Sequence, residues 1–189
     1  MKVINLKQRT PEWYQWRKEG IGASDIPVLT GNSPYTNKRQ LLLQKKGVGK
    51  PTFVNEHVIK ISNKVEEDAI IYFKEKKEII FEPLCAEHGE NSLLRASLDG
   101  WSEKEGILEC KYVSFDYFND LKENKKIRKD HQDQMQFQML ITGQSYVNYY
   151  VQNTKGEYLI LTLREDKEYQ KNLEKLAVDF LEELNIGLN

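Results

Sequence analysis

The fold is decided by one continuous stretch, Ser92-Leu-Leu-Arg-Ala-Ser-Leu-Asp-Gly-Trp-Ser-Glu-Lys-Glu-Gly-Ile-Leu-Glu-Cys-Lys-Tyr-Val113. Apolar and polar residues alternate through 92–98 and again through 107–113, a period that predicts two strands. The connection Gly100–Gly106 is too short for a crossover between parallel strands. The two strands are therefore predicted to be antiparallel neighbours.

The second strand carries an acid and a base on one face. Glu-x-Lys occurs four times in the chain, at Glu75/Lys77, Glu109/Lys111, Glu123/Lys125 and Glu165/Lys167. Residues i and i+2 point apart on a helix but share a face on a strand, so context singles out Glu109 and Lys111. Two charges inside an otherwise apolar strand are costly unless they are paired or bind an ion.

Asp99 is predicted to lie beside this pair. Folding the hairpin near Glu103 places Asp99 opposite residue 107 or within two residues of Glu109. Facing or diagonal partners are about 5 to 8 Å apart at Cβ, near enough for two carboxylates to share a metal ion. Mg²⁺ and Mn²⁺ prefer oxygen ligands and would relieve the repulsion. The alternative is a salt-bridged surface hairpin in which Asp99-Gly100 starts a plain turn.

The rest of the chain adds helices on either side of these strands. Capping residues and apolar periodicity predict the following elements: helices from Thr10-Pro11, from Ser24-Asp25 with Pro27 in its first turn, and from Thr36 to near Gly47; a long helix Glu56–Lys76; a strand 78–81; a helix capped by Asp130 that runs to Ile141 and ends at Gly143; a hairpin of 146–152 and 158–163; and a terminal helix from Asp166. We predict an α/β (α+β) fold with a mixed sheet flanked by helices, in a single domain over 1–189.

Composition limits the function. The chain has 189 residues, 39% hydrophobic and 30% charged, with a formal net charge of −1. No apolar run reaches the length of a membrane helix, and the start of the chain lacks the apolar core of a secretory signal, so we expect a soluble, cytoplasmic protein. Cys85 and Cys110 show no metal-binding spacing. Near-neutral charge makes any nucleic-acid contact local; Lys122–Lys129 is a candidate, or a solvated loop or helix face.

Four motifs in order carry a family resemblance. They are Trp13-Tyr-Gln-Trp-Arg-Lys-Glu-Gly-Ile-Gly-Ala-Ser-Asp25, Asn63-Lys-Val-Glu-Glu-Asp-Ala69, Ser97-Leu-Asp-Gly100 with Glu109-Cys-Lys111, and Asp133-Gln-Met-Gln-Phe-Gln-Met-Leu-Ile-Thr-Gly143. The third resembles the PD-(D/E)xK nuclease signature. The chain from about Arg9 to Gly143 resembles the YqaJ-type, phage lambda exonuclease branch of that superfamily.

The resemblance implies a restriction-endonuclease-like core and a 5′-to-3′ exonuclease acting on double-stranded DNA ends. It implies Mg²⁺ or Mn²⁺ as cofactor, with two ions held by Glu66, Asp99, Glu109 and the backbone carbonyl of Cys110, whose side chain would point into the core. Arg17 and Ser24 would hold the terminal 5′-phosphate of the DNA; both are placed in the first motif. Ser24 can equally be an ordinary helix N-cap, and the two readings are compatible.

Other residues have alternative roles. Lys111 would orient or help deprotonate the attacking water, or form a simple ion pair with Glu109. Gln134 could position Lys111 or a phosphate. The family often has Gly at Asn63 and Pro at Glu67, which leaves open whether Glu66 or Glu67 faces the metal. Its proline before the motif aspartate is Leu98 here.

The aromatic residues of the first helix also have two readings. Trp13, Tyr14 and Trp16 could stack on bases at a DNA end, but we expect two of the three to be core anchors.

Partners and competing functions follow from the same family. Its lambda-type members imply a homotrimer and a single-strand annealing protein as partner, in a bacterial cell that carries the phage or prophage. The competing functions are an endonuclease of the same superfamily and a catalytically silent DNA-binding subunit.

Overall fold

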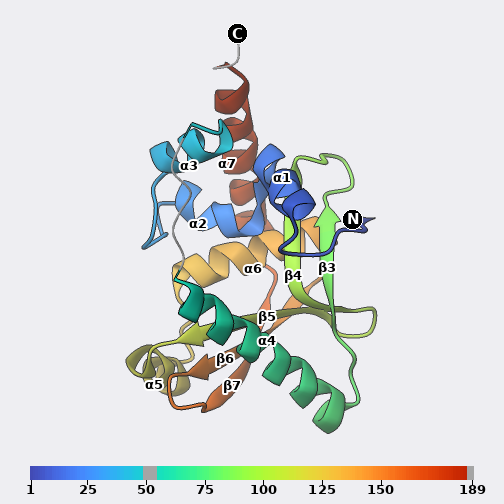
Figure 1. Cartoon of the computed structure of the whole chain (residues 1–189), viewed down its shortest axis with the longest axis vertical. Coiled ribbons are helices and arrows are strands. Elements are labelled where there is room, and N and C mark those ends of the chain that lie inside the picture. The colour runs from blue at the N-terminus through green and yellow to red at the C-terminus, as the bar shows by residue number, and fades with distance from the viewer. Residues whose placement is uncertain (49–54, 187–189) are drawn as a thin grey trace.

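A mixed seven-stranded sheet organises the protein, whose residues 1–48 and 55–186 are described by a computed structural model (Figure 1). Six strands follow one another across the sheet: β1 (Lys2–Ile4), β3 (Glu82–Glu87), β4 (Leu94–Ser102), β5 (Gly106–Val113), β6 (Tyr146–Asn153) and β7 (Tyr158–Arg164). The short β2 (Ile21–Gly22) pairs in parallel with the start of β4. β5 and β6 are parallel, and the other neighbours are antiparallel.

Helices cover both faces of this sheet (Figure 1). They are α1 (Pro11–Glu19), α2 (Ile26–Leu29), α3 (Lys38–Lys45), α4 (Glu56–Lys77), α5 (Phe115–Asn124), α6 (Lys129–Thr142) and α7 (Lys167–Ile186). α4 packs on one face through a small core with β5 and β6. α2, α6 and α7 form the larger core with the opposite face. The predicted mixed sheet flanked by helices is confirmed.

The hairpin of β4 and β5 is antiparallel, as predicted, but its strands part early. Their pairs run only from Ser102 with Gly106 to Gly100 with Leu108. Beyond that point β4 pairs with β3 and β2, while β5 pairs with β6. Asp99 and Glu109 are the next residues on either side, so they lie at a fork in the sheet.

The predicted strand 78–81 is wrong. Glu78 has a left-handed backbone (φ 57°) as the C-cap of α4, and the N–H of Ile79 donates to Phe73 O at 3.1 Å. These residues therefore complete the end of the helix, and the strand begins only at Glu82. Apolar alternation over four residues did not distinguish a strand from a helix end followed by a short link.

Several predicted helix starts move by one or two residues. The helix from Thr36 begins at Lys38 with Asn37 as its cap, and the helix predicted to be capped by Asp130 has Arg128 as its N-cap, with Asp130 in its first turn. The predictions of Thr10 as N-cap and of Gly143 as the helix end are confirmed.

Helix α5 was missed by the sequence analysis. Ser114 caps it by accepting from the N–H of Tyr117, and Lys122 of the basic run lies in its last turn. The alternating strand pattern ends at Val113, almost directly before α5, so the start of this helix was not recognised.

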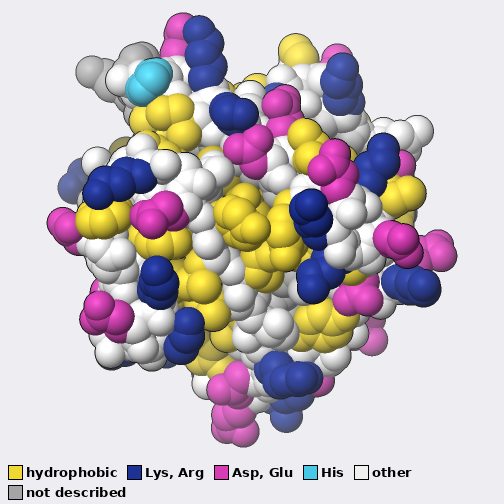
Figure 2. Space-filling view, turned by 90° about the horizontal axis from the view of Figure 1, so that it is seen from below, with side chains coloured by type: hydrophobic (Ala, Val, Ile, Leu, Met, Phe, Trp, Pro, Cys, Tyr) yellow, Lys and Arg dark blue, Asp and Glu magenta, His cyan; other side chains and the backbone are white. Residues whose placement is uncertain are grey.

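The end of the molecule opposite α7 carries a mixed surface. Seen from below, hydrophobic side chains gather in the middle of this face, with basic and acidic side chains around them (Figure 2). In the parts of the chain that the structure describes, no helix has the length and apolar character needed to span a bilayer.

Candidate active site

Glu109 is the most deeply buried carboxylate of the predicted set, with 1% of its surface exposed. Lys111 Nζ and Gln134 Nε2 both donate to its Oε1, the latter at 2.7 Å. Gln138 Nε2 donates to its Oε2. A buried carboxylate is costly without such partners, and here donors from β5 and α6 satisfy both oxygens of Glu109 inside the protein.

Lys111 lies on the same face of β5 as Glu109, as the strand period predicted. Its Nζ also donates to Gln134 Oε1 at 3.1 Å, so the amide of Gln134 bridges the acid and the amine. Burial alone would lower the pKa of Lys111, but the charges of Glu109 and Asp99 outweigh it and raise that pKa. Lys111 is therefore an ammonium at neutral pH.

Asp99 lies across the fork from this pair. Its Oδ2 accepts from the backbone N–H of Cys110 at 2.8 Å. Burial raises the pKa of Asp99 well above its usual value, and the nearby charges of Glu109 and Glu66 raise it further. These effects require the three carboxylates to lie within electrostatic reach of one another.

Glu66 reaches this cluster from α4. Both of its carboxylate oxygens accept from Arg9 Nη2, at 2.7 and 2.9 Å. Burial raises the pKa of Glu66 and the charge of Glu109 adds to this, while Arg9 opposes the rise. Glu67 is exposed. Of the two glutamates that the sequence left open, the structure thus places Glu66 beside the other carboxylates.

The donor set suits a hard divalent cation, because three crowded carboxylates repel one another and present only oxygen. In the conformation described for residues 1–48 and 55–186, however, no three acidic, histidine or cysteine side chains converge on a common point. Glu66 is engaged by Arg9, and Glu109 by Lys111 and two glutamines. The assignment of metal ligands therefore stays a prediction.

Cys110 separates the two charged residues of β5. Its side chain lies in the small apolar core under α4 with 8% exposure, as expected. The strand thus presents Leu108 and Cys110 to α4, while Glu109 and Lys111 lie on the opposite face, toward α6, between Ile107 and Val113 of the larger core. Metal ligation by the Cys110 carbonyl stays a prediction.

The two residues predicted to hold a 5′-phosphate meet one another. Arg17 Nη2 donates to Ser24 Oγ at 2.5 Å, and the guanidinium lies over the Trp13 ring, 4.6 Å from its centre. Ser24 is not a helix N-cap, because it lies in a 3₁₀ turn, Ala23–Asp25, whose cap is Gly22.

The aromatic residues of α1 divide as predicted. Trp13 and Trp16 are core residues, 6% and 8% exposed. Tyr14 is 59% exposed and available to a ligand.

Two residues that donate hydrogen bonds to these carboxylates, Gln138 and Arg9, were not predicted from the sequence. Gln138 is one turn after Gln134 on α6, so its i+4 spacing was a usable signal. No sequence signal pointed to Arg9, because it is a loop residue with φ of 67° that binds Glu66, 57 positions further along the chain.

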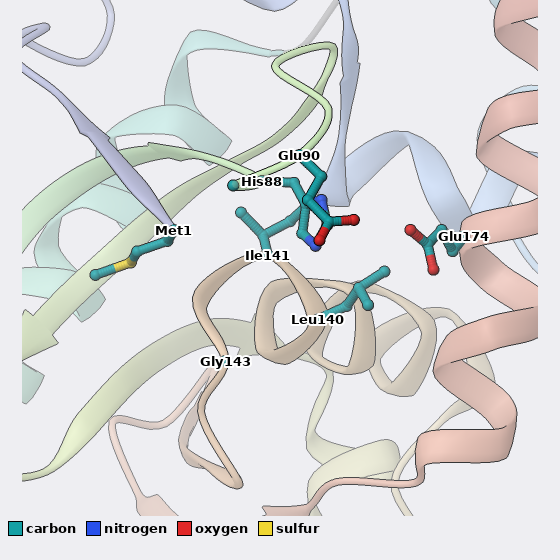
Figure 3. A pocket seen from close by; sticks show the side chains of 8 residues that line it. Met1, His88, Glu90, Leu140, Ile141, Gly143 and Glu174 are labelled. Atoms are coloured by element: carbon teal, nitrogen blue, oxygen red, sulfur yellow. The ribbon is translucent and has the colours of Figure 1, made fainter.

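A hollow of about 410 Å³ lies elsewhere, between the β3–β4 loop, the end of α6 and α7 (Figure 3). His88, Glu90, Leu140, Ile141 and Glu174 are among its lining residues. None of the predicted site residues lines this hollow. The candidate site is therefore the group of carboxylates at the strand fork and not the hollow.

Solved structures share this fold. An alkaline exonuclease from Laribacter hongkongensis, LHK-Exo, superposes with a TM-score of 0.78 at 19% identity, over 94% of each chain, and its complex with dAMP gives a TM-score of 0.79. A phage-related exonuclease from Haemophilus somnus 129PT gives a TM-score of 0.68 at 13% identity, over 90% of this chain and 96% of the other. The fold class is that of these α+β proteins.

The sequence places the chain within a family. The model of the YqaJ-like viral recombinase domain matches residues 12–145, and the chain belongs to that family. It is also 28% identical over 105 residues to the uncharacterized protein R354 of Acanthamoeba polyphaga mimivirus. That alignment covers 55% of this chain and 19% of the viral protein, so this chain spans about a fifth of that relative.

Proposed function

We propose that this protein is a divalent-metal-dependent exonuclease that degrades double-stranded DNA from its ends in the 5′-to-3′ direction. One observation carries the proposal: Glu66, Asp99, Glu109 and Lys111, from α4, β4 and β5, lie within electrostatic reach of one another around one strand fork. The family and the exonuclease fold of the solved relatives support it.

The carboxylates account for metal binding. Nucleases of this family generally use divalent metals, which neutralise the phosphate and lower the pKa of bound water when present. Asp99, Glu109 and Glu66 would hold Mg²⁺ or Mn²⁺, two ions in our proposal, with the Cys110 carbonyl as a further ligand. Arg9 would release the oxygens of Glu66 for this purpose.

Lys111 and Gln134 would hold and orient the water that attacks the phosphodiester. The ammonium of Lys111 would hold and orient the attacking water beside Glu109, and it offsets negative charge near the phosphate. The bonds of Gln134 to both residues favour a positioning role over direct contact with a phosphate.

Arg17 and Ser24 account for end recognition. A guanidinium can grip a phosphate with two parallel hydrogen bonds, and the Ser24 hydroxyl beside it adds a donor. One solved structure of LHK-Exo is a complex with dAMP, which is a nucleoside monophosphate. The homotrimer, the annealing partner and the location in a bacterial host stay predictions.

The decisive experiment is digestion of duplex DNA, labelled at either end, with Mg²⁺ or with EDTA. We expect release of nucleotides from 5′-ends only with the metal. Cleavage of circular duplexes would indicate an endonuclease instead. Absence of any cleavage with Mg²⁺ or Mn²⁺ would indicate a silent DNA-binding subunit.

Divalent ions should stabilise the fold, because they bind the native carboxylate cluster and not the unfolded chain. At an ion concentration 100 times the dissociation constant, the free energy of unfolding rises by about 2.7 kcal/mol. Thermal melts with Mn²⁺, Mg²⁺ and EDTA measure this, with Asp68→Asn on α4 as the control that keeps the effect. If the ions raised the free energy of unfolding of Glu109→Gln as much as that of the wild type, the ion would bind elsewhere.

Arg17→Ala should weaken recognition of phosphorylated ends. We expect KM for a 5′-phosphorylated duplex to rise about tenfold, because a charge-assisted contact is lost, while kcat changes little. Steady-state kinetics on duplexes with 5′-phosphate and 5′-hydroxyl ends measure the change. A loss that is the same on both substrates would remove Arg17 from end recognition.

A further inference from the structure

The side chain of Lys45, the last residue of α3, is shielded from solvent and makes several polar contacts. Its side chain is 8% exposed, and its Nζ lies 2.7 Å from each of three oxygens: Arg17 O, Gly20 O and Asp25 Oδ2. An ammonium has three N–H donors, so every donor of Lys45 is used within the protein. Lys45 therefore has no donor left for a ligand.

These three oxygens bracket the Arg17–Ser24 pair. One belongs to the backbone of Arg17 itself, and another belongs to Asp25, the residue after Ser24. Asp25 Oδ2 also accepts from the N–H of Gly22 at 2.9 Å, which closes the turn that carries Ser24. One ammonium thus fixes the end of α1 relative to the 3₁₀ turn.

The segment between these anchor points has little freedom elsewhere. A Cβ at Gly20 would lie 2.5 Å from Leu93 O, so the backbone of Gly20 packs directly against the backbone of Leu93. Ile21 N donates to the same carbonyl at 2.7 Å. The backbone at Gly20 and Ile21 thus lies against Leu93, the residue before β4, on one side, and Lys45 binds the carbonyl of Gly20 on the other.

We propose that Lys45 is a positioning residue for the proposed 5′-phosphate site of Arg17 and Ser24, acting through the backbone of Arg17 and the carboxylate of Asp25. The inference rests on the proposed function of Arg17 and Ser24, and goes beyond it by naming the group that sets their relative position. Two donors that grip one phosphate must keep a fixed separation, and small displacements cost affinity steeply. A side chain that only stabilised the fold would not alter discrimination between DNA ends.

The test replaces Lys45 by methionine, which keeps the stem and removes the donors. We expect the preference for 5′-phosphorylated over 5′-hydroxyl duplex, measured as the ratio of KM values, to fall about tenfold. KM for the hydroxyl duplex and kcat on both substrates should stay within about twofold of the wild type. Lys45→Arg, which keeps the charge and several donors, should recover part of the preference.

Lys38→Met is the matched control. Lys38 is another lysine of α3, and it pairs with Glu183 on α7 instead of with Arg17, Gly20 or Asp25. Its replacement should leave the preference unchanged.

Asp25→Asn is the second test variant if Lys45→Met does not fold. It weakens the contact with Lys45 and keeps an oxygen acceptor for the N–H of Gly22. We expect the preference for phosphorylated ends to fall about threefold.

The outcomes separate the two proposals. If the wild type prefers phosphorylated ends and Lys45→Met, or Asp25→Asn in its place, retains that preference in full, the role of Lys45 is overturned and the proposed function stands. If the wild type shows no preference, phosphate recognition by Arg17 and Ser24 is wrong, and the inference fails with it. A reduced preference with normal kcat supports both.

Discussion

Asp99→Asn should abolish DNA cleavage without harming the fold. Each factor of ten in rate corresponds to about 1.4 kcal/mol, and a carboxylate that holds the metal accounts for several kcal/mol of transition-state stabilisation, so we expect a loss of about 1000-fold or more. The amide keeps an oxygen for the N–H of Cys110. Single-turnover digestion of end-labelled duplex with excess protein measures the rate.

Stability should change in the opposite direction from activity. Burial and the neighbouring Glu109 and Glu66 disfavour the charge of Asp99 in the folded state, as its raised pKa indicates. A neutral side chain removes that repulsion, so we expect the melting temperature without metal to stay equal or to rise. Asp68→Asn, the same change on α4, should cleave like the wild type. Unchanged cleavage by Asp99→Asn would refute the site.

Lys111→Met should lower the cleavage rate about 10²- to 10⁴-fold, the range expected when a group that orients or deprotonates the nucleophile is lost. Binding of DNA should change much less, because Lys111 is one cation among several. Pre-steady-state rates and binding affinities, measured on the same end-labelled duplex, separate the two effects.

Lys111→Arg distinguishes the catalytic role from a simple ion pair with Glu109. Arginine keeps the charge but is effectively never deprotonated and is planar and longer, so it should not restore the rate if the ammonium handles water. If Lys111 serves only the ion pair, arginine should restore most of the activity. Lys77→Met, in the Glu75-x-Lys77 occurrence on the exposed side of α4, should be silent.

Local sequence was sufficient where the information is local. The alternation around Asp99 and Glu109 predicted an antiparallel hairpin, and the strand period put Glu109 and Lys111 on one face. Apolar steps of three and four predicted α4 within one residue. Both signals come from neighbours along the chain, which is why they could be read without the fold.

The same kind of reasoning was wrong at element boundaries. Residues 78–81 alternate like a strand but form the end of α4 and a link, and α5 was missed because a strand pattern runs directly into it. Ser24 resembled an N-cap but lies in a 3₁₀ turn that Gly22 begins. At residues 78–81 the backbone hydrogen bond from the N–H of Ile79 to Phe73 O ends the helix, and the residue pattern does not encode that bond.

By itself, then, the sequence determined the hairpin, the side of the strand that bears charge, and the family to which the four motifs point. Only the tertiary structure decided that β4 and β5 part beside Asp99, so that Glu66 of α4 and the glutamines of α6 reach one place. It alone brought Arg9 to Glu66 and Lys45 to the Arg17–Ser24 turn. The physical reason is that period and capping act over a few residues, whereas these contacts join residues that lie from 20 positions apart (Lys45 and Asp25, 45 − 25) to 57 positions apart (Arg9 and Glu66), and burial of the whole core sets them.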